Sequence, residues 1–576
     1  MPDTSLPRAA ADPIAMEVFA NRLLSITEEM GHVLIRASFS TNIKERKDCS
    51  VGMFDATGRC LAQAAHMPMH LGSLMGAVVT VLERYRVDQM QPGDAFVCND
   101  VFLARGTHQP DINIVTPIFC DGRVAFFAAN TGHHSDVGGP NPGSMSQSAR
   151  TIFEEGLRIP VMRIVRTGEI DRDLLEMIAH NSREPAERIL DLRAQIAVNE
   201  RGAELMQRLV ATDGLAAVEA AIEALLAYTG RRLRARIAEL PDGDYQGERW
   251  MDGDGVPGGE PIVLRTRIVV RGDDLLLDFA GSAAQARGAL NIATNALEAT
   301  CYYAVKALLD PDLPANSGLF DAIRISAPEG SIVNPRFPAA TAARAISCNR
   351  LSGAIFDAMN QVLPRPRQMA QSHDSVPALL VSGQRRTGTY VYIETIGGGA
   401  GAREGADGAE AVQMHVTNSS NLPAEALEIE YPLLVDAYAL VEDSGGAGQW
   451  RGGLGIARQI SSRVDGSLLT ARGEGHVMVA PGLHGGLSGG QANLLIEPGT
   501  PRERLLPTAT TALPMTAGLG VRMDTPGGGG FGDPALRDPR ALAADILDGK
   551  VSRASAIRDY GAERVAAALS AWKEPS

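Results

Sequence analysis

Residues 99–139 of the chain read NDVFLARGTHQPDINIVTPIFCDGRVAFFAANTGHHSDVGG. Within this stretch, two mostly apolar runs at 112–119 and 123–130 flank the dipeptide Asp121-Gly122, which is typical of a tight β-turn. The pattern predicts an antiparallel hairpin. Polar sequence rich in histidine and aspartate stands at its open end, on both strands.

These polar residues predict a metal site. If the two strands pair around a tight turn, Asp111 lies beside Asn130, and His108 and Asp111 come close to His133. Imidazole and carboxylate are ligands of zinc, manganese and iron, and the glycines nearby let the backbone turn so that several side chains converge. We therefore expect one shared metal site.

Length and composition exclude several classes of protein. The chain has 576 residues, of which 45% are hydrophobic and 21% charged, and its formal net charge is -14. Its length exceeds what one hydrophobic core usually supports, so several domains are expected. The negative charge argues against a nucleic-acid partner. No apolar run reaches the roughly 18 residues of a membrane helix, and residues 1–13 lack the apolar core of a signal peptide.

The cysteines indicate a cytoplasmic protein with buried, reduced thiols. They are widely spaced and form no CxxC pair, so neither a zinc ribbon nor a redox motif is indicated. The six are Cys49, Cys60, Cys98, Cys120, Cys301 and Cys348.

Hydrophobic periodicity predicts an α+β fold of several domains, with mixed helices and largely antiparallel sheets. Helical spacing covers 14–38, 70–85, 174–240, 291–309 and two C-terminal helices within 534–572 that are split near Lys550. Strand patterns cover 50–65, 95–98, 112–130, 243–250, 262–270, 274–279 and 378–395. We expect a domain of helices and hairpins carrying the metal site at 1–240, a mixed α/β domain at 241–395, a glycine-rich β domain at 396–533 and C-terminal helices at 534–576.

Glycine-rich segments recur in the C-terminal half. They lie at 444–448, 451–455 and 526–533, and none has the spacing of a Rossmann or P-loop nucleotide site. We interpret them as tight turns in β-rich structure. Residues 397–408, rich in glycine and alanine, predict a mobile loop.

Motifs in fixed order along nearly the whole chain resemble the hydantoinase B / 5-oxoprolinase family. They are KDCS at 47–50, PMHLGS at 68–73, ND at 99–100, GTHQPD at 106–111, GHHSDVGG at 132–139, EGLRIP at 155–160, DLRAQ at 191–195, DSGGAG at 443–448, RGGLG at 451–455 and TPGGGGFGDP at 525–534. Cys49 and Val101-Phe102 depart from the family pattern, but they replace none of the candidate ligands.

The resemblance implies the metal-bearing catalytic subunit of an ATP-dependent amidohydrolase that opens a hydantoin or lactam ring. A hydantoinase A-type partner subunit would use ATP and Mg to phosphorylate the amide, which fits the missing nucleotide motif. This chain would hold a divalent ion, zinc with manganese or iron as alternatives, that activates water for attack on the activated carbon. A small third subunit is a further candidate partner.

The resemblance also assigns site residues. It implies that the metal ligands are Asp48, His108, Asp111 and His133, and that His134 and Asp136 are catalytic candidates that orient ligands or carry protons.

Other charged residues near these motifs are weaker candidates. Arg46 and Arg105 could hold a phosphoryl group, because arginine matches phosphate geometry, although an exposed or ion-paired arginine is an equal alternative. His66 and His70 have the i,i+4 spacing of a helical metal pair, but Pro68 breaks the helix between them. We expect His70 to be a structural or pocket residue.

Three alternative functions stay open. The first is a subunit of an ATP-dependent ketone carboxylase of the acetone or acetophenone type, in which an enol phosphate would meet activated bicarbonate at the same metal. The others are a metallohydrolase that needs no ATP and a noncatalytic subunit with a structural zinc ion.

Overall fold

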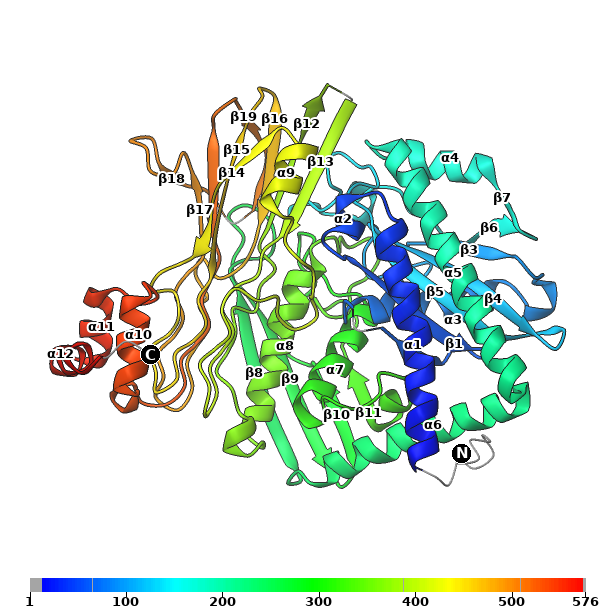
Figure 1. Cartoon of the computed structure of the whole chain (residues 1–576), viewed down its shortest axis with the longest axis horizontal. Helices are drawn as coiled ribbons and strands as arrows, with labels where there is room; N and C mark the ends of the chain where they lie inside the picture. The colour runs from blue at the N-terminus through cyan, green and yellow to red at the C-terminus, as the bar shows by residue number, and fades with distance from the viewer. Residues whose placement is uncertain (1–12, 65, 387, 508, 573–576) are drawn as a thin grey trace.

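A computed structural model describes residues 13–64, 66–386, 388–507 and 509–572. The predicted fold class is confirmed: the chain is an α+β protein whose sheets are largely antiparallel. Figure 1 shows a helix-covered sheet formed by the N-terminal half, a β-rich C-terminal half beside it and short helices at the far edge. Residues 1–12, on which the signal-peptide prediction rests, lie outside the described residues.

A seven-stranded sheet forms the N-terminal half, with strand order β2-β1-β5-β4-β3-β6-β7. Its strands are β1 (Cys49–Asp55), β2 (Cys60–Gln63), β3 (Ala95–Cys98), β4 (Asp111–Cys120), β5 (Arg123–His133), β6 (Met162–Arg166) and β7 (Glu169–Ile170). The predicted hairpin is its centre, because β4 and β5 are antiparallel neighbours in the middle of the sheet.

The predicted register of this hairpin was wrong by a few residues. The pairing of Cys120 with Arg123 at the turn would by itself place Asp111 opposite Gly132, and an irregularity at Ile118 and Phe119 shifts the pairing by one further residue, so that Asn130 pairs with Ile114. Strand β5 also extends beyond its predicted end at Asn130, and its last residue, His133, pairs directly with Asp111. The correction brings the candidate ligands closer together than the sequence suggested.

Helices bury both faces of this sheet. On one face lie α1 (Pro13–Ala37), α5 (Pro185–Asp213) and α6 (Leu215–Ala238), and their core includes Phe126 of β5. On the other face lies α3 (His70–Arg84), whose core includes the next residue, Phe127. Successive strand residues point to opposite faces, so burial on both sides explains why β5 is a continuous apolar run.

Three further sheets follow along the chain. A four-stranded sheet, β11-β10-β9-β8, is antiparallel except for the β10–β11 pair. The C-terminal half contains the sheets β13-β12-β16-β19 and β14-β15-β20-β17-β18. Their strands are β8 (Gly243–Met251), β9 (Ile262–Arg271), β10 (Asp274–Asp278), β11 (Ile323–Ser326), β12 (Ala378–Arg385), β13 (Gly388–Thr395), β14 (Leu433–Leu440), β15 (Ile456–Ser462), β16 (Ser467–Arg472), β17 (Asn493–Ile496), β18 (Arg504–Leu505), β19 (Thr510–Met515) and β20 (Gly520–Asp524).

The remaining helices include α7 and α8, which pack against each other and share one large core with β9 and β10. That core also includes Met69 and Val416, which lie outside the predicted domain 241–395. The predicted domain boundaries stay a prediction. The helices are α2 (Thr41–Lys44), α4 (Arg172–His180), α7 (Thr294–Leu309), α8 (Arg344–Asn360), α9 (Ala424–Glu430), α10 (Pro539–Leu547), α11 (Arg553–Tyr560) and α12 (Ala562–Ala571).

The C-terminal segment contains three helices where two were predicted. The predicted break near Lys550 separates α10 from α11, and a second break follows at Gly561, whose φ is +90°. A left-handed backbone at glycine ends a helix without steric cost, and this signal was missed.

The glycine-rich segments are closely packed extended chains and not the predicted turns. Within 526–530 no glycine has a positive φ, whereas a Cβ on Gly528 would lie 2.0 Å from the carbonyl oxygen of Ala400. The segment 397–408, predicted to be a mobile loop, is part of the same packing. The backbone amides of Gly399 and Ala402 donate hydrogen bonds to the carbonyl oxygens of Pro526 and Gly529. These glycines let neighbouring backbones approach more closely than any side chain would allow.

Two predictions about the chain's class can be compared with the structure. All six cysteines are buried and free, as predicted. Among the described residues, none of the helices combines the length and apolar character needed to cross a membrane.

We expect Gly528→Ala to destabilise the protein, because its Cβ would overlap the backbone of Ala400. Overpacking of this kind typically costs about 1–3 kcal/mol, measured here as a lower urea midpoint. Gly520→Ala is the matched control, since its Cβ would meet nothing closer than 3.7 Å. Equal midpoints for the two variants would contradict the close-packing interpretation.

Candidate metal centre

His108, Asp111 and His133 form one buried cluster. Asp111 begins β4 and His133 ends β5, so strand pairing places them side by side, and His108 reaches them from the preceding loop. His108 Nε2 and His133 Nδ1 each lie 2.9 Å from Asp111 Oδ1 and 3.1 Å from each other. The two imidazole centroids are 4.9 Å apart.

This arrangement fits a divalent cation. Ligand bonds of roughly 2.0–2.2 Å place neighbouring ligand atoms about 3.3–3.6 Å apart in a tetrahedral site and about 2.8–3.1 Å apart in an octahedral one, so atoms spaced at 2.9–3.1 Å can share one ion after little adjustment. His108 Nδ1 lies 3.1 Å from the carbonyl oxygen of Ala342 and 2.9 Å from Arg344 Nη1, and these contacts orient the ring with Nε2 toward Asp111 and His133. The three residues therefore form a possible metal-binding site.

Burial and charge set the protonation state of the cluster. Burial, followed by the charge of the nearby Arg344 guanidinium, lowers the pKa of His108 to about 3, so the ring is neutral as a ligand must be. Burial alone would raise the pKa of Asp111, but His108, His70 and Arg344 together hold it well below its ordinary value. Arg344 Nη2 donates to Asp111 Oδ2 at 2.7 Å, so the carboxylate keeps a partner on its second oxygen.

A buried carboxylate positions the backbone that meets His108. Glu155 accepts the amides of Thr341 and Ala342 at 2.6 and 2.7 Å, and the Ala342 carbonyl faces the His108 ring. Burial raises the pKa of Glu155 to about 8, although these amide donors oppose the increase. Glu155 belongs to one of the sequence motifs, but its neighbours in sequence give no sign of this role.

Asp48 lies at the same cavity but outside the three-residue cluster. Its Oδ1 is 3.6 Å from His70 Nε2, and the same His70 nitrogen is 3.7 Å from Asp111 Oδ1. Asp48 and His70 line a cavity of about 30 Å³ together with His108 and His133. Such a volume holds roughly one or two water molecules, and it is far too small for a ring amide.

Three arginines line this cavity, so its lining is rich in positive charge. They are Arg46, Arg344 and Arg472, all almost completely buried. Burial, followed by the charges of Arg344 and Arg46, lowers the pKa of Arg472 to about 9. Arg344 and Arg472 were missed in the sequence because they are distant from every candidate ligand. Arg105, the second predicted phosphoryl candidate, is instead half-exposed and pairs with Glu83 at 2.6 Å.

His134 and Asp136 lie away from the cavity. His134 Nε2 is 3.0 Å from Gln195 Oε1 of helix α5, and neither residue lines the cavity. Asp136 accepts the amides of Gly143 and Arg183 and pairs with the Arg183 guanidinium at 2.8 Å. This placement favours a supporting role for both residues over direct contact with substrate, and the catalytic role assigned to them stays a prediction.

The fold and this cluster define an α+β protein with a buried histidine and aspartate centre. Residues 12–534 match the family model described as Hydantoinase B/oxoprolinase, and the chain belongs to this family. A relative from Pseudomonas sp. (strain NS671), named as the candidate B-type component of a D-/L-hydantoinase, is 31% identical over 96% of this chain and 95% of its own length. The 5-oxoprolinase PfmaA of Pestalotiopsis fici is 32% identical over 91% of this chain, which spans 41% of that longer protein.

Two solved structures share the fold. The ATP-dependent caprolactamase of Pseudomonas jessenii superposes with a TM-score of 0.87 at 27% identity and covers 96% of both chains. Nucleotide-free acetone carboxylase gives a TM-score of 0.89 at 20% identity, covering 98% of this chain and 83% of that one.

We expect Asp111→Asn to lower the bound divalent metal to a small fraction of the wild-type content. The substitution keeps the shape of the side chain. It removes the negative charge of the carboxylate, which lies between His108 and His133 and would bind the metal ion. Asp136→Asn is the matched control, because it also neutralises a buried carboxylate, but Asp136 does not belong to the three-residue cluster. Elemental analysis of the purified variants measures this, and equal metal loss in both would refute the assignment.

Proposed function

We propose that this chain is the metal-bearing catalytic subunit of an ATP-dependent amidohydrolase that opens a hydantoin or lactam ring. The observation that carries the proposal is the convergence of His108, Asp111 and His133 at a cavity lined by arginines. Family membership and the likeness to a caprolactamase support cyclic amide hydrolysis as the reaction.

Activation of the amide is assigned to a partner of the hydantoinase A type. The name of the Pseudomonas relative, which describes one component of a hydantoinase, supports a second subunit. The partner would phosphorylate the amide oxygen with ATP and Mg, which makes the carbon electrophilic.

The residues of this chain would then divide the hydrolytic step. His108, Asp111 and His133 would hold a divalent ion, with Asp48 as a fourth ligand, and the ion would supply Lewis-acid activation of water. We propose zinc, with manganese or iron as alternatives, because nitrogen and oxygen donors suit all three. Arg46, Arg344 and Arg472 would face the phosphoryl group and stabilise it as it departs.

We expect the purified chain to open no ring in the presence of ATP, and we expect an A-type partner to restore the reaction.

In the complex with that partner, His108→Ala should lower the rate of ring opening by at least about a hundredfold, the size expected when a group acting on the transition state is lost. Product analysis measures the loss, and gel filtration checks that assembly survives. An unchanged rate of ring opening in His108→Ala would contradict the proposal. Unfolding of the variant would favour a structural zinc ion instead.

We expect Arg46→Met to slow ring opening by about ten- to a hundredfold while metal content stays at the wild-type level. The reason is the loss of one buried cation that faces the phosphoryl group. Arg105→Met removes a charge that is half-exposed and paired with Glu83, so its rate should stay close to that of the wild type. Steady-state rates at saturating substrate compare the two, and equal effects would contradict the assignment of Arg46.

The alternative, a ketone carboxylase subunit, predicts a different product from the same complex. With ketone, bicarbonate and ATP it would form a carboxylate, and cyclic amides would stay closed. The ATP-independent hydrolase predicts ring opening by the single chain.

A further inference from the structure

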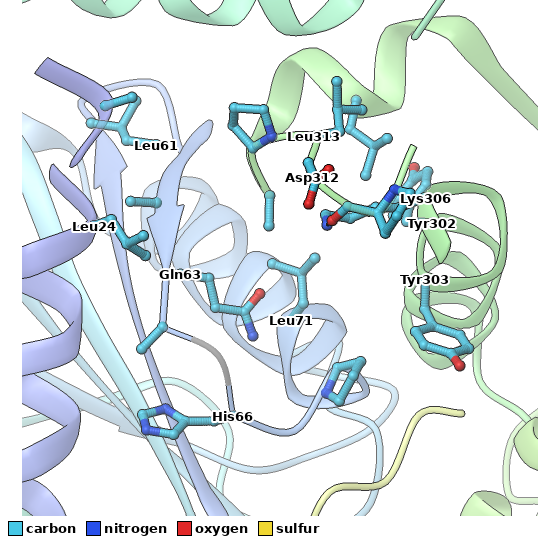
Figure 2. Close-up of a pocket in the computed structure, with 18 of the residues that line it drawn as sticks. Leu24, Leu61, Gln63, His66, Leu71, Tyr302, Tyr303, Lys306, Asp312 and Leu313 are labelled. Atoms are coloured by element: carbon cyan, nitrogen blue, oxygen red, sulfur yellow. The ribbon is translucent and has the colours of Figure 1, made fainter. Parts of the chain in front are cut away.

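A second, much larger pocket lies next to the metal cavity. It has a volume of about 520 Å³, within the range of small-molecule sites. Figure 2 shows Leu24, Leu61 and Leu71 from the N-terminal elements facing Tyr302 and Lys306 of helix α7 across the space.

One thickness of chain separates this pocket from the metal cavity. Along the segment 66–70, His66 and Pro68 line the pocket, whereas Met67, Met69 and His70 line the metal cavity. The segment 417–418 alternates in the same way, with Thr417 at the cavity and Asn418 at the pocket. We call these two segments the wall.

The wall is held together by weak contacts. The amide of Met69 donates to the carbonyl oxygen of Val416 at 3.3 Å, and the amide of Asn418 donates to the sulfur of Met67 at 3.0 Å. Thioether sulfur is a weak acceptor, and methionine side chains change rotamer readily. Passage from the pocket to the metal cavity therefore requires a movement of the wall.

The two spaces differ in charge and polarity. Most of the pocket is formed by aliphatic and aromatic side chains, and its ionised groups are Lys306 opposed by Glu28 and Asp312. Burial, followed by the charge of His70, lowers the pKa of His66 to about 4, so this ring adds no cation at neutral pH. The metal cavity has the opposite balance, because its three arginines outnumber the carboxylates of Asp48 and Asp111.

We infer that the pocket of Figure 2 binds the non-reacting body of the substrate, and that this body is apolar and uncharged. The activated amide faces the wall, and its phosphoryl group is drawn toward the arginines beyond it. A ring amide that bears a carboxylate, such as 5-oxoproline, is disfavoured, because Glu28 and Asp312 leave the pocket with an excess of negative charge. The inference rests on the proposed function and specifies its substrate class.

Caprolactam and 5-oxoproline are suitable probes, being ring amides without and with a carboxylate. Isothermal titration of the full chain should show caprolactam binding at least about tenfold tighter than 5-oxoproline. Leu24→Trp fills the pocket from half-buried α1 and should weaken caprolactam binding by at least about tenfold. Val18→Trp is the control, because Val18 lies on the same helix, is 50% exposed and does not line the pocket.

A second variant keeps the inference testable if Leu24→Trp fails to fold. Asp312→Lys reverses an exposed charge at the pocket and should bring the affinity for 5-oxoproline closer to that for caprolactam, so an unchanged ratio of the two affinities overturns the inference. The inference is overturned if the chain does not bind caprolactam, if it binds both probes equally or if Leu24→Trp binds like the wild type.

His108→Ala separates this inference from the proposed function. The variant should bind caprolactam normally, because His108 lines only the metal cavity, yet it should lose ring opening in the complex. Normal binding with intact ring opening would refute the metal-dependent function and leave the pocket assignment standing. Loss of ring opening together with an unaltered Leu24→Trp would refute the pocket alone.

Discussion

The pairing of Asp111 with His133 across the central hairpin is the constraint on which the candidate metal centre depends. Side chains alternate between the faces of a sheet, so a slip of one residue would send His133 to the opposite face from Asp111. Cores on both sides of β5 resist such a slip, since Phe126 and Phe127 would have to exchange environments. The helices that bury the sheet therefore also fix the geometry of the cluster.

The structural features that the sequence predicted well are formed by residues close to one another in the chain. The turn at Asp121-Gly122 and the apolar runs beside it define the hairpin, and a hairpin necessarily brings its two ends together. A two-residue turn at Asp121-Gly122 already places Asp111 opposite Gly132, so most of the register could have been read from the turn. Only the last one-residue shift, at Ile118 and Phe119, depends on packing and leaves no mark in the turn. Arg344 and Glu155 were missed for a different reason: each reaches the centre through tertiary structure, and one charged residue in a long chain does not reveal its partner.

The glycine-rich segments show why composition can mislead. Glycine is favoured both where φ is positive and where two backbones approach closely, and a sequence does not distinguish these causes. Gly561 and Gly528 illustrate the two cases, the first by a φ of +90° and the second by a Cβ that would lie 2.0 Å from a carbonyl oxygen. Interpreting 397–408 as a mobile loop was the same error, because its amides are bound inside the packed layers.

The contact between His108 and the carbonyl oxygen of Ala342 joins residues that are 234 positions apart. A fragment that ends before residue 341 would keep the cluster's three side chains but lose the Ala342 carbonyl and the Arg344 guanidinium that contact His108, as well as the amides that hold Glu155. The candidate centre therefore belongs to the chain as a whole, since neither part contains the complete set of contacts. The match to 5-oxoprolinase PfmaA, a longer protein of which this chain spans 41%, covers 91% of this chain and so includes both parts.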